Sequence, residues 1–348
     1  MNATFAVGFA PGTRKAYHRH FERYVRWVTE TGVAADGYVP RPSEVDLIYF
    51  ADHLGKTIGA GAVKATLAGV AAGFVERGFG NVTRDQFGAH LPRLRRMIRA
   101  ISRKGGGRKA KKRKALTVGK LERLLPHLRA AVKGSAYDAV AYAAALSMAV
   151  YLLLRVSECT AAQVAARDPR RSLNFKGAEV LPSLDDPQWL QVRIKASKVD
   201  VFREGVTLKV AANGPPTCPV RAMARWMRAR VGRDPKSPLF VLADGSFVTR
   251  SRLQAVLQDG IRRAGYDPCH YTTHSLRIGG ATTLACAGCP SETLMLLGRW
   301  ASDCYVRYLR VDDARRREIS ASMALVQTSD LQAAQTRGLV SEDGWIVP

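Results

Sequence analysis

Apolar residues in the first hundred positions recur at intervals of three and four, as they do along one face of a helix. Phe21, Tyr24 and Val28 follow this spacing, and so do Leu94, Ile98 and Ile101 further along. Basic residues occupy the other faces, so this part of the chain is expected to fold as a helical bundle with a basic exterior. The predicted helices cover residues 13–31, 42–56, 61–77 and 84–104.

The pattern changes after this bundle. Helical periodicity returns over residues 118–132 and 135–164, and three short β-prone segments follow at 178–181, 189–194 and 201–210. These segments predict a small antiparallel sheet of three strands. Helices are expected again over residues 219–230, 250–264, 274–287 and 291–300 and from 303 onward. The predicted fold class is therefore mainly α with a small antiparallel β-sheet (α+β).

Residues 139–154 form an uncharged run that is slightly shorter than a bilayer span. The run is rich in alanine and is followed by Arg155, which is typical of a buried core helix. The first eleven residues have no charged start and only a short apolar patch, so they do not match a signal peptide. We therefore expect an intracellular protein without a membrane partner.

The charge balance points to a polyanionic partner. The 348 residues are enough for two domains, and they carry 54 Lys and Arg against 29 Asp and Glu, a formal charge of +25. Residues 1–114 alone hold 22 basic and 8 acidic residues, and 22 minus 8 leaves +14. This excess favours nucleic acid as the partner, with a merely soluble basic protein as the alternative.

The densest positive charge follows three glycines at residues 105–107. Flexible glycines before a basic run are typical of an interdomain linker that lies along a phosphate backbone. A nuclear-localisation signal and a solvated linker with neither role are the alternatives. The candidate DNA contacts in this part of the chain are Arg93, Arg96, Arg99, Arg103, Arg108, Lys109, Lys111, Lys112, Arg113 and Lys114.

Six cysteines in a chain of this length are more plausible as reduced thiols than as a disulfide framework. Cys286 and Cys289 have the spacing of a redox or zinc pair, and Cys269 with His270 are conceivable further ligands. The glycine and the proline on either side of Cys289 instead favour a helix stop and restart. We therefore expect no metal ion and no other cofactor.

Several residues further along the chain have the chemistry that phosphoryl transfer needs. Breaking a phosphodiester takes cations on the non-bridging oxygens, an in-line nucleophile and an acid for the leaving oxygen. Arg155 and Arg277 are candidates for a paired clamp, because a guanidinium grips two phosphate oxygens at once. Glu158 follows Arg155 by about one helical turn and is expected to orient it, although an ordinary surface pair has the same spacing.

Three more side chains complete this candidate set. His274 precedes Arg277 by three residues, so the two share one helical face. Lys198 lies at the tip of a predicted hairpin, where an ammonium can reach a groove and protonate a leaving 5′ oxygen. Trp300 can donate its indole N–H to a phosphate or pack against the nucleophile's helix. Each has a plain structural alternative, as a cap histidine, a surface lysine or a core tryptophan.

The order and context of these residues resemble the tyrosine recombinase (phage-integrase-like) family, from about Pro11 to Val326. The matching stretches are LLRVSE at 153–158, Lys198, HSLR at 274–277 and LGRW at 297–300. The resemblance implies a helical core-binding (SAM-like) domain that forms a C-shaped clamp on DNA with the catalytic domain. The implied division is 1–104 for the core-binding domain, 105–114 for the basic linker, 115–327 for the tyrosine recombinase catalytic domain and 328–348 for the tail.

The resemblance also implies a mechanism and a partner. A tyrosine attacks the scissile phosphate, a 3′-phosphotyrosyl link forms, and the 5′ hydroxyl of a partner strand resolves it without a metal or nucleotide. The implied partner is double-stranded DNA, bound by a homotetramer, and no small-molecule substrate is expected. Residues 315–327 are the candidate for a terminal helix that docks on a neighbouring copy or on its own domain.

Two tyrosines, Tyr305 and Tyr308, are candidates for the nucleophile. The setting of Tyr308, RYLR at 307–310, resembles the family's nucleophile helix, and its distance from Trp300 is one residue short of the commonest bacterial spacing. We therefore favour Tyr308. Tyr305 lies closer to Trp300 and is expected to pack.

Residues 298–308 are most similar to recombinases of eukaryotic mobile elements, the DIRS and Crypton kinds, which favours a nuclear location over the cytoplasm or nucleoid. Type IB topoisomerases, with a related Arg, Lys and Tyr set, are the nearest enzymatic alternative, and a non-cutting DNA-binding protein derived from a recombinase is another. The spacing of His274 and Arg277, together with Trp300, favours a recombinase. Every catalytic position is filled, which disfavours a protein that no longer cuts.

Overall fold

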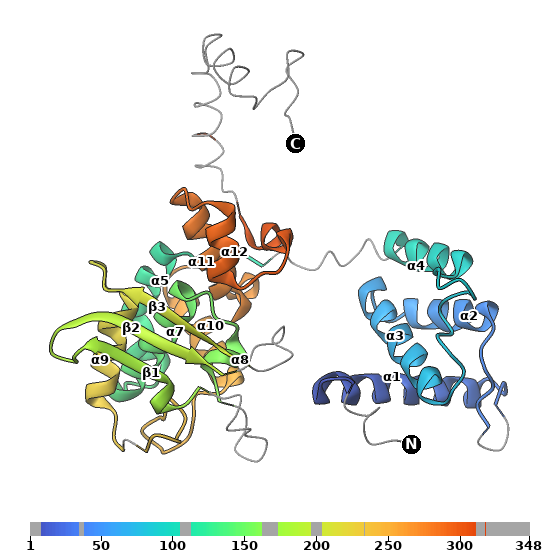
Figure 1. The fold of residues 1–348 in the computed structure, drawn as a ribbon, viewed down its shortest axis with the longest axis horizontal. Coiled ribbons are helices and arrows are strands. Elements are labelled where there is room, and N and C mark those ends of the chain that lie inside the picture. The colour runs from blue at the N-terminus through green and yellow to red at the C-terminus, as the bar shows by residue number, and fades with distance from the viewer. Residues whose placement is uncertain are drawn as a thin grey trace, which may run out of the picture. The chain divides into compact units, whose positions relative to one another are not determined.

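The computed structural model describes residues 8–34, 38–104, 113–161, 173–195, 204–232, 234–310 and 317. The chain divides into two compact units, Met1–Ala110 and Lys111–Pro348, each with its own elements (Figure 1). The described residues are mainly helical, with a small antiparallel sheet in the second unit, so the predicted fold class is confirmed. None of the described helices is both long enough and apolar enough to cross a bilayer.

The first unit is a bundle of helices around an aromatic core. Its helices are α1 (Pro11–Glu30), α2 (Glu44–Gly55), α3 (Ala60–Glu76) and α4 (Pro92–Lys104). Tyr24 packs edge-on against Phe50 at 5.1 Å and against Phe74 at 5.9 Å between ring centroids. The apolar positions that predicted these helices are the ones that the core buries, including Val28, Leu94 and Ile101.

One predicted helix of this unit is too long at its start. Residues 84–91 were expected to be helical, but α4 begins at Pro92. The Asp85 carboxylate accepts the backbone N–H groups of Phe87 and Ala89, both at 2.9 Å, and Gly88 has a φ of 79°. This local hydrogen bonding holds a turn in place of helix.

The second unit packs helices on a three-stranded sheet. Its helices before the sheet are α5 (Val118–Leu124), η2 (Leu125–His127), α6 (Leu128–Ala131), α7 (Ala136–Tyr151), α8 (Val156–Cys159) and η4 (Phe175–Gly177). The strands are β1 (Ala178–Pro182), β2 (Pro187–Ile194) and β3 (Val206–Ala211). The helices after the sheet are α9 (Pro219–Ala229), α10 (Arg250–Arg263), η5 (Pro268–His270), α11 (His274–Cys286), α12 (Ser291–Gly298) and η6 (Asp303–Tyr308).

The sheet has the order β1-β2-β3 with both pairs antiparallel, as the sequence predicts. Leu190 pairs with Val180 on one side and Val210 on the other. Leu190, Val192 and Ile194 alternate into the core, which also holds Trp226 of α9 and the apolar residues of α7. The predicted core helix at 139–154 is thus the centre of this unit.

Two glycines let α11 approach the centre of the unit closely. A Cβ on Gly280 would overlap the carbonyl of Val150, near the end of α7, and a Cβ on Gly279 would overlap the carbonyl of Leu116. Without these side chains, α11 lies directly against the end of α7. This contact places Arg277 of α11 beside Leu153.

Two predicted helices of this unit end earlier than expected, each next to a residue with positive φ, and two further predicted elements differ in type or extent. The helix predicted over 135–164 stops at Tyr151 because Leu153 has a φ of 49°, and α12 stops at Gly298 because Arg299 has a φ of 54°. Where a helix was expected from 303 onward, a 3₁₀ helix covers Asp303–Tyr308. Residues 311–316 and 318–348, and with them most of the candidate terminal helix at 315–327, lie outside the described residues. The strand predicted over 201–210 begins at Val206, and residues 201–203 lie outside the described residues.

Replacement of Gly279 by alanine is expected to destabilise the second unit by about 3 kcal/mol, because the added methyl group must displace the backbone at Leu116. Urea unfolding measures this change. Gly119→Ala is the matched control, since nothing lies within 4 Å of its Cβ position, and the gain in helix propensity is about 0.5 kcal/mol. Equal stability of the two variants would contradict the close approach of α11.

Candidate active site

Arg155 and Glu158 form a compact pair at the start of α8. The backbone N–H of Arg155 donates to Glu158 Oε2 at 2.8 Å, and Arg155 Nη1 donates to Glu158 Oε1 at 3.0 Å. The Glu158 side chain is 3% exposed and that of Arg155 is 23% exposed. One carboxylate therefore holds the start of the helix and one edge of the guanidinium, while part of Arg155 stays accessible to a ligand.

Arg277 lies almost completely buried on α11, with 1% of its surface exposed. Its Nη1 donates to the carbonyl of Leu153 and its Nη2 to the carbonyl of Gly298. The guanidinium carbon lies 4.6 Å from the centroid of the Trp300 ring. Two main-chain carbonyls and an aromatic face therefore hold this buried cation.

Arg299 is a third guanidinium in the same place. Its Nη2 donates to Glu158 Oε2 at 2.9 Å and to the carbonyl of Leu153 at 3.1 Å. Burial, then the charges of Arg155 and Arg299, lower the pKa of Arg277 to about 10. Three guanidiniums around one carboxylate leave two positive charges in excess within this group of described residues. An anion such as a phosphate would offset that charge.

Tyr308 lies among the other candidate residues at the end of η6. Its ring centroid is 5.1 Å from that of His274, 5.0 Å from that of Trp300 and 5.8 Å from the guanidinium carbon of Arg277. The hydroxyl of Thr282 donates to the carbonyl of Tyr308 at 3.2 Å and ties η6 to α11. The phenol therefore lies at the edge of the guanidinium group.

Tyr305 is near Trp300 as well, with ring centroids 6.3 Å apart. Its hydroxyl donates to Ser291 Oγ at 2.8 Å, at the start of α12. Residues three apart eclipse one another in a 3₁₀ helix, so both phenols lie on the Trp300 side of η6. The two differ in what surrounds them, because Tyr308 contacts His274 and Arg277 whereas Tyr305 contacts Ser291.

Burial lowers the pKa of His274, and the nearby charges of Arg113, Arg277, Arg310 and Arg250 lower it further. The imidazole is therefore neutral at neutral pH and able to accept a proton. Arg113 and Lys114, two of the predicted DNA contacts, lie in this region. The backbone N–H of Lys114 donates to the carbonyl of His270 at 2.9 Å, and Arg310 Nε donates to the carbonyl of Arg113 at 3.2 Å.

The remaining predicted contacts divide into exposed residues and residues that the structure does not describe. Arg93, Arg96, Arg99 and Arg103 are exposed on α4 in the first unit. Lys198, between β2 and β3, and the linker residues Arg108, Lys109, Lys111 and Lys112 lie outside the described residues. The six residues that the structure brings together in the second unit are Arg155, Glu158, His274, Arg277, Trp300 and Tyr308.

Arg299 and the Leu153 carbonyl were not among the site residues expected from the sequence. Arg299 was part of the LGRW stretch, but within that stretch only Trp300 was given a function. For Arg299, the sequence held one signal of a role, its place between Gly298 and Trp300 in the LGRW stretch. A Cβ on Gly298 would overlap the Trp300 ring, so the glycine is what lets the indole fold back beneath Arg277.

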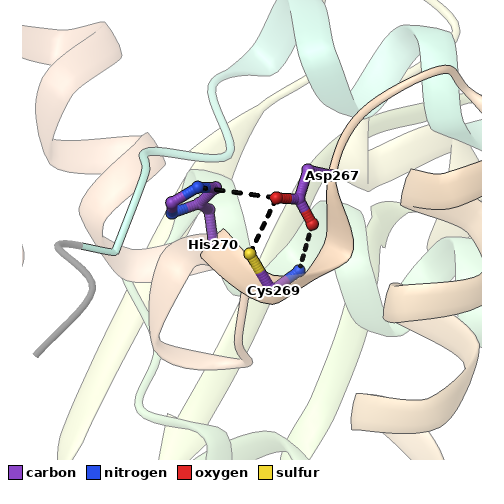
Figure 2. A group of neighbouring side chains, drawn as sticks. All are labelled: Asp267, Cys269 and His270. Atoms are coloured by element: carbon purple, nitrogen blue, oxygen red, sulfur yellow. Dashed lines mark hydrogen bonds and ion pairs between the residues drawn. The ribbon is translucent and has the colours of Figure 1, made fainter.

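Figure 2 shows Asp267, Cys269 and His270, whose potential metal-ligating atoms lie within 4.8 Å of one another. Asp267 is the N-cap of η5, and its carboxylate accepts the N–H of Cys269 at 2.9 Å and the Cys269 thiol at 2.8 Å. These contacts are those of a cap on a short helix. The group does not include Cys286 or Cys289, which lie on either side of the helix stop at Gly288 and ahead of the restart at Ser291, as the sequence predicts.

Neither a family model nor a curated protein matches the chain. Solved structures do match it. XerH site-specific recombinase bound to difH substrate, in a pre-cleavage complex, is 16% identical with a TM-score of 0.55, covering 88% of this chain and 78% of XerH. A variant of the Tn1549 transposon integrase in complex with transposon right end DNA is 14% identical with a TM-score of 0.55, over 92% and 96% of the two chains.

A lambda integrase dimer bound to a COC′ core site is 13% identical, with a TM-score of 0.55 over 90% of this chain and 93% of the integrase. All three matches extend over most of both chains at low identity. The protein therefore has the tyrosine recombinase fold.

The low pKa of His274 predicts how stability depends on pH. Below the unfolded-state pKa of 6.5, His274 binds a proton in the unfolded chain while it is still neutral in the folded chain. The free energy of unfolding therefore falls as the pH falls. His274→Gln should flatten this part of the curve. Urea unfolding of both proteins across this pH range measures the difference. The pKa of His20 is also lowered, but His20 is present in both proteins, so its contribution to the pH dependence cancels in the comparison. Parallel curves would contradict the burial of a neutral imidazole.

Proposed function

We propose that the protein cuts and rejoins double-stranded DNA as a site-specific recombinase, with Tyr308 as the nucleophile. The observation that carries this proposal is the position of the Tyr308 ring. Its centroid lies 5.1 Å from that of His274, 5.0 Å from that of Trp300 and 5.8 Å from the Arg277 guanidinium carbon. A nucleophile, a neutral base and an excess of fixed positive charge meet at one place. This combination suits transfer of a phosphoryl group to a tyrosine.

In the proposed first step, Arg155 and Arg277 bind the non-bridging oxygens of the scissile phosphate. The Tyr308 oxygen attacks the phosphorus while neutral His274 holds the phenol in place and accepts its proton. The bond from phosphorus to the 5′ oxygen breaks, and Lys198 gives that oxygen a proton. The products are a 3′-phosphotyrosyl link and a free 5′ hydroxyl.

In the second step, the 5′ hydroxyl of a partner strand attacks the phosphotyrosyl link. The new phosphodiester forms, the bond to Tyr308 breaks, and the proton transfers run in reverse. Glu158 orients Arg155, and Trp300 packs beneath Arg277 and beside Tyr308. Because the number of phosphodiester bonds is the same before and after, the reaction is reversible.

The DNA duplex is proposed to contact both units. The exposed arginines of α4 and the linker at 105–114 supply phosphate contacts, and such contacts position a protein without specifying sequence. Four copies on two duplexes would give strand exchange. The DNA-bound neighbours named above support DNA as the partner. Four further points stay predictions: the tetramer, the four-part division of the chain, the eukaryotic mobile-element branch and the nuclear location.

Tyr308→Phe should abolish covalent capture of DNA while binding is retained, because only the attacking oxygen is lost. The assay uses a pool of nicked DNA duplexes of random sequence in EDTA, followed by denaturing electrophoresis of the protein-DNA adduct. Tyr305→Phe is the matched control and should keep most of the wild-type yield. Capture by Tyr308→Phe together with its loss in Tyr305→Phe would transfer the role of nucleophile to Tyr305. Tight binding without capture by the wild type would favour a DNA-binding protein that does not cut.

Arg155→Lys should lower the rate of capture by about 10²- to 10³-fold, since lysine keeps the charge but loses the fork that grips two oxygens. Single-turnover capture measures the rate, and DNA binding should change little. Arg225→Lys, an exposed change on α9, is the control. A near-normal rate for Arg155→Lys would remove Arg155 from the clamp.

A further inference from the structure

Arg299 lies in a position where glycine would be expected. It follows the last residue of α12 with φ 54° and ψ 49°, the left-handed conformation in which helices commonly end on glycine. Its side chain nevertheless turns inward and is 10% exposed. Burial lowers the pKa of Arg299, so the site both strains the backbone and desolvates a cation at this residue.

The acceptors that Arg299 binds are the ones that hold the two clamp arginines. Glu158 Oε2 accepts from Arg299 at 2.9 Å, and the two oxygens of that carboxylate also accept from Arg155. The Leu153 carbonyl accepts from Arg299 at 3.1 Å and also from Arg277 Nη1. Arg299 therefore shares one hydrogen-bond acceptor with Arg155 and another with Arg277.

The backbone at Leu153 is unusual in the same way. The described non-glycine residues with positive φ are Lys133 at 54°, Leu153 at 49° and Arg299 at 54°. Two of the three are joined by a hydrogen bond from the Arg299 side chain to the Leu153 carbonyl. Backbone conformations of this kind persist where the surroundings hold them in place, and they gather at functional sites.

We propose that Arg299 is a positioning residue that sets both clamp arginines, an inference that rests on the proposed function. It fixes the Leu153 peptide so that its carbonyl points at Arg277. It also shares the charge of Glu158. With Arg155 as the sole partner, the carboxylate would cancel the charge that the phosphate needs, whereas a second guanidinium on the same carboxylate leaves that charge in excess.

A direct contact from Arg299 to DNA phosphate is the competing outcome. Arg299 Nε and Nη1 are buried without a hydrogen-bond partner among the described residues, so they have donors to spare. Loss of a direct phosphate contact would lower the salt dependence of binding, by about 0.9 in the slope of log K against log salt. Loss of a positioning residue leaves that slope unchanged.

The test compares the full-length Arg299→Gly variant with Lys133→Gly. Both changes relieve a left-handed residue and remove one cation, but Lys133 is exposed at the end of α6, outside the site. Single-turnover capture on the pool of nicked duplexes gives the rate, and binding to intact random duplex over a salt series gives the slope. We expect Arg299→Gly to slow capture by about 10- to 100-fold, as loss of a supporting residue does, with the slope and affinity kept. Lys133→Gly should match wild type in capture rate, salt slope and affinity.

A double substitution shows whether Arg299 acts through Glu158. If it does, adding Arg299→Gly to Glu158→Gln should slow capture little beyond the slower single variant. Fully additive losses, a lowered salt slope, or capture by Arg299→Gly at the wild-type rate would each overturn the inference. If Arg299→Gly does not fold, Arg299→Lys serves in its place. A slowed rate is again expected, because the lysine nitrogen lies one atom short of the Nη2 that donates to both acceptors.

The two proposals fail in different ways. No capture by wild type would refute the proposed function itself. Capture by wild type with an equal rate for the Arg299 variants would refute only the positioning by Arg299.

Discussion

The arrangement of the second unit depends on two shared acceptors, the Glu158 carboxylate and the Leu153 carbonyl. Between them they receive hydrogen bonds from three guanidiniums, which come from α8, α11 and the end of α12. Buried cations are costly unless they are paired, and truncating one partner of such a group leaves the others uncompensated. The ends of three helices therefore have to meet at one point. Three local features allow the helix ends to meet. They are the glycines of α11, the fold-back of Trp300 over Gly298, and the left-handed residues at 153 and 299.

The same electrostatics explains how the site is prepared for an anion. One carboxylate does not balance three guanidiniums, and burial together with the charges of Arg155 and Arg299 lowers the pKa of Arg277. Burial, followed by the charges of nearby arginines that include Arg113 and Arg277, lowers the pKa of His274. The lowered pKa keeps the imidazole of His274 neutral near pH 7, as a proton acceptor must be. Tyr308 joins this group through its ring contacts and through the Thr282 hydrogen bond to its carbonyl. Preorganised charge of this kind acts most strongly where water is excluded.

Regular periodicity was enough to predict the fold class, the three strands and the core helix, because burial of apolar residues at a fixed interval determines these elements. The pairing of Arg155 with Glu158 also followed from spacing alone. What the sequence could not indicate was where the backbone departs from that regularity. A leucine and an arginine in the left-handed conformation, at 153 and 299, have no local signature, since contacts from distant segments hold them. The turn at 84–91 was missed for a different reason, because the Asp85 hydrogen bonds compete with a good helical pattern.

The central claim is that the positive charge in excess in the guanidinium group binds a DNA phosphate placed for attack by Tyr308. The most direct measurement captures the wild-type protein on nicked duplexes in EDTA, digests the adduct and maps the DNA-linked peptide by mass spectrometry. The account predicts that the nucleotide remnant is found on Tyr308, with phosphate joining the phenol to a 3′ end. A remnant on another residue, or no adduct despite tight binding, would contradict it.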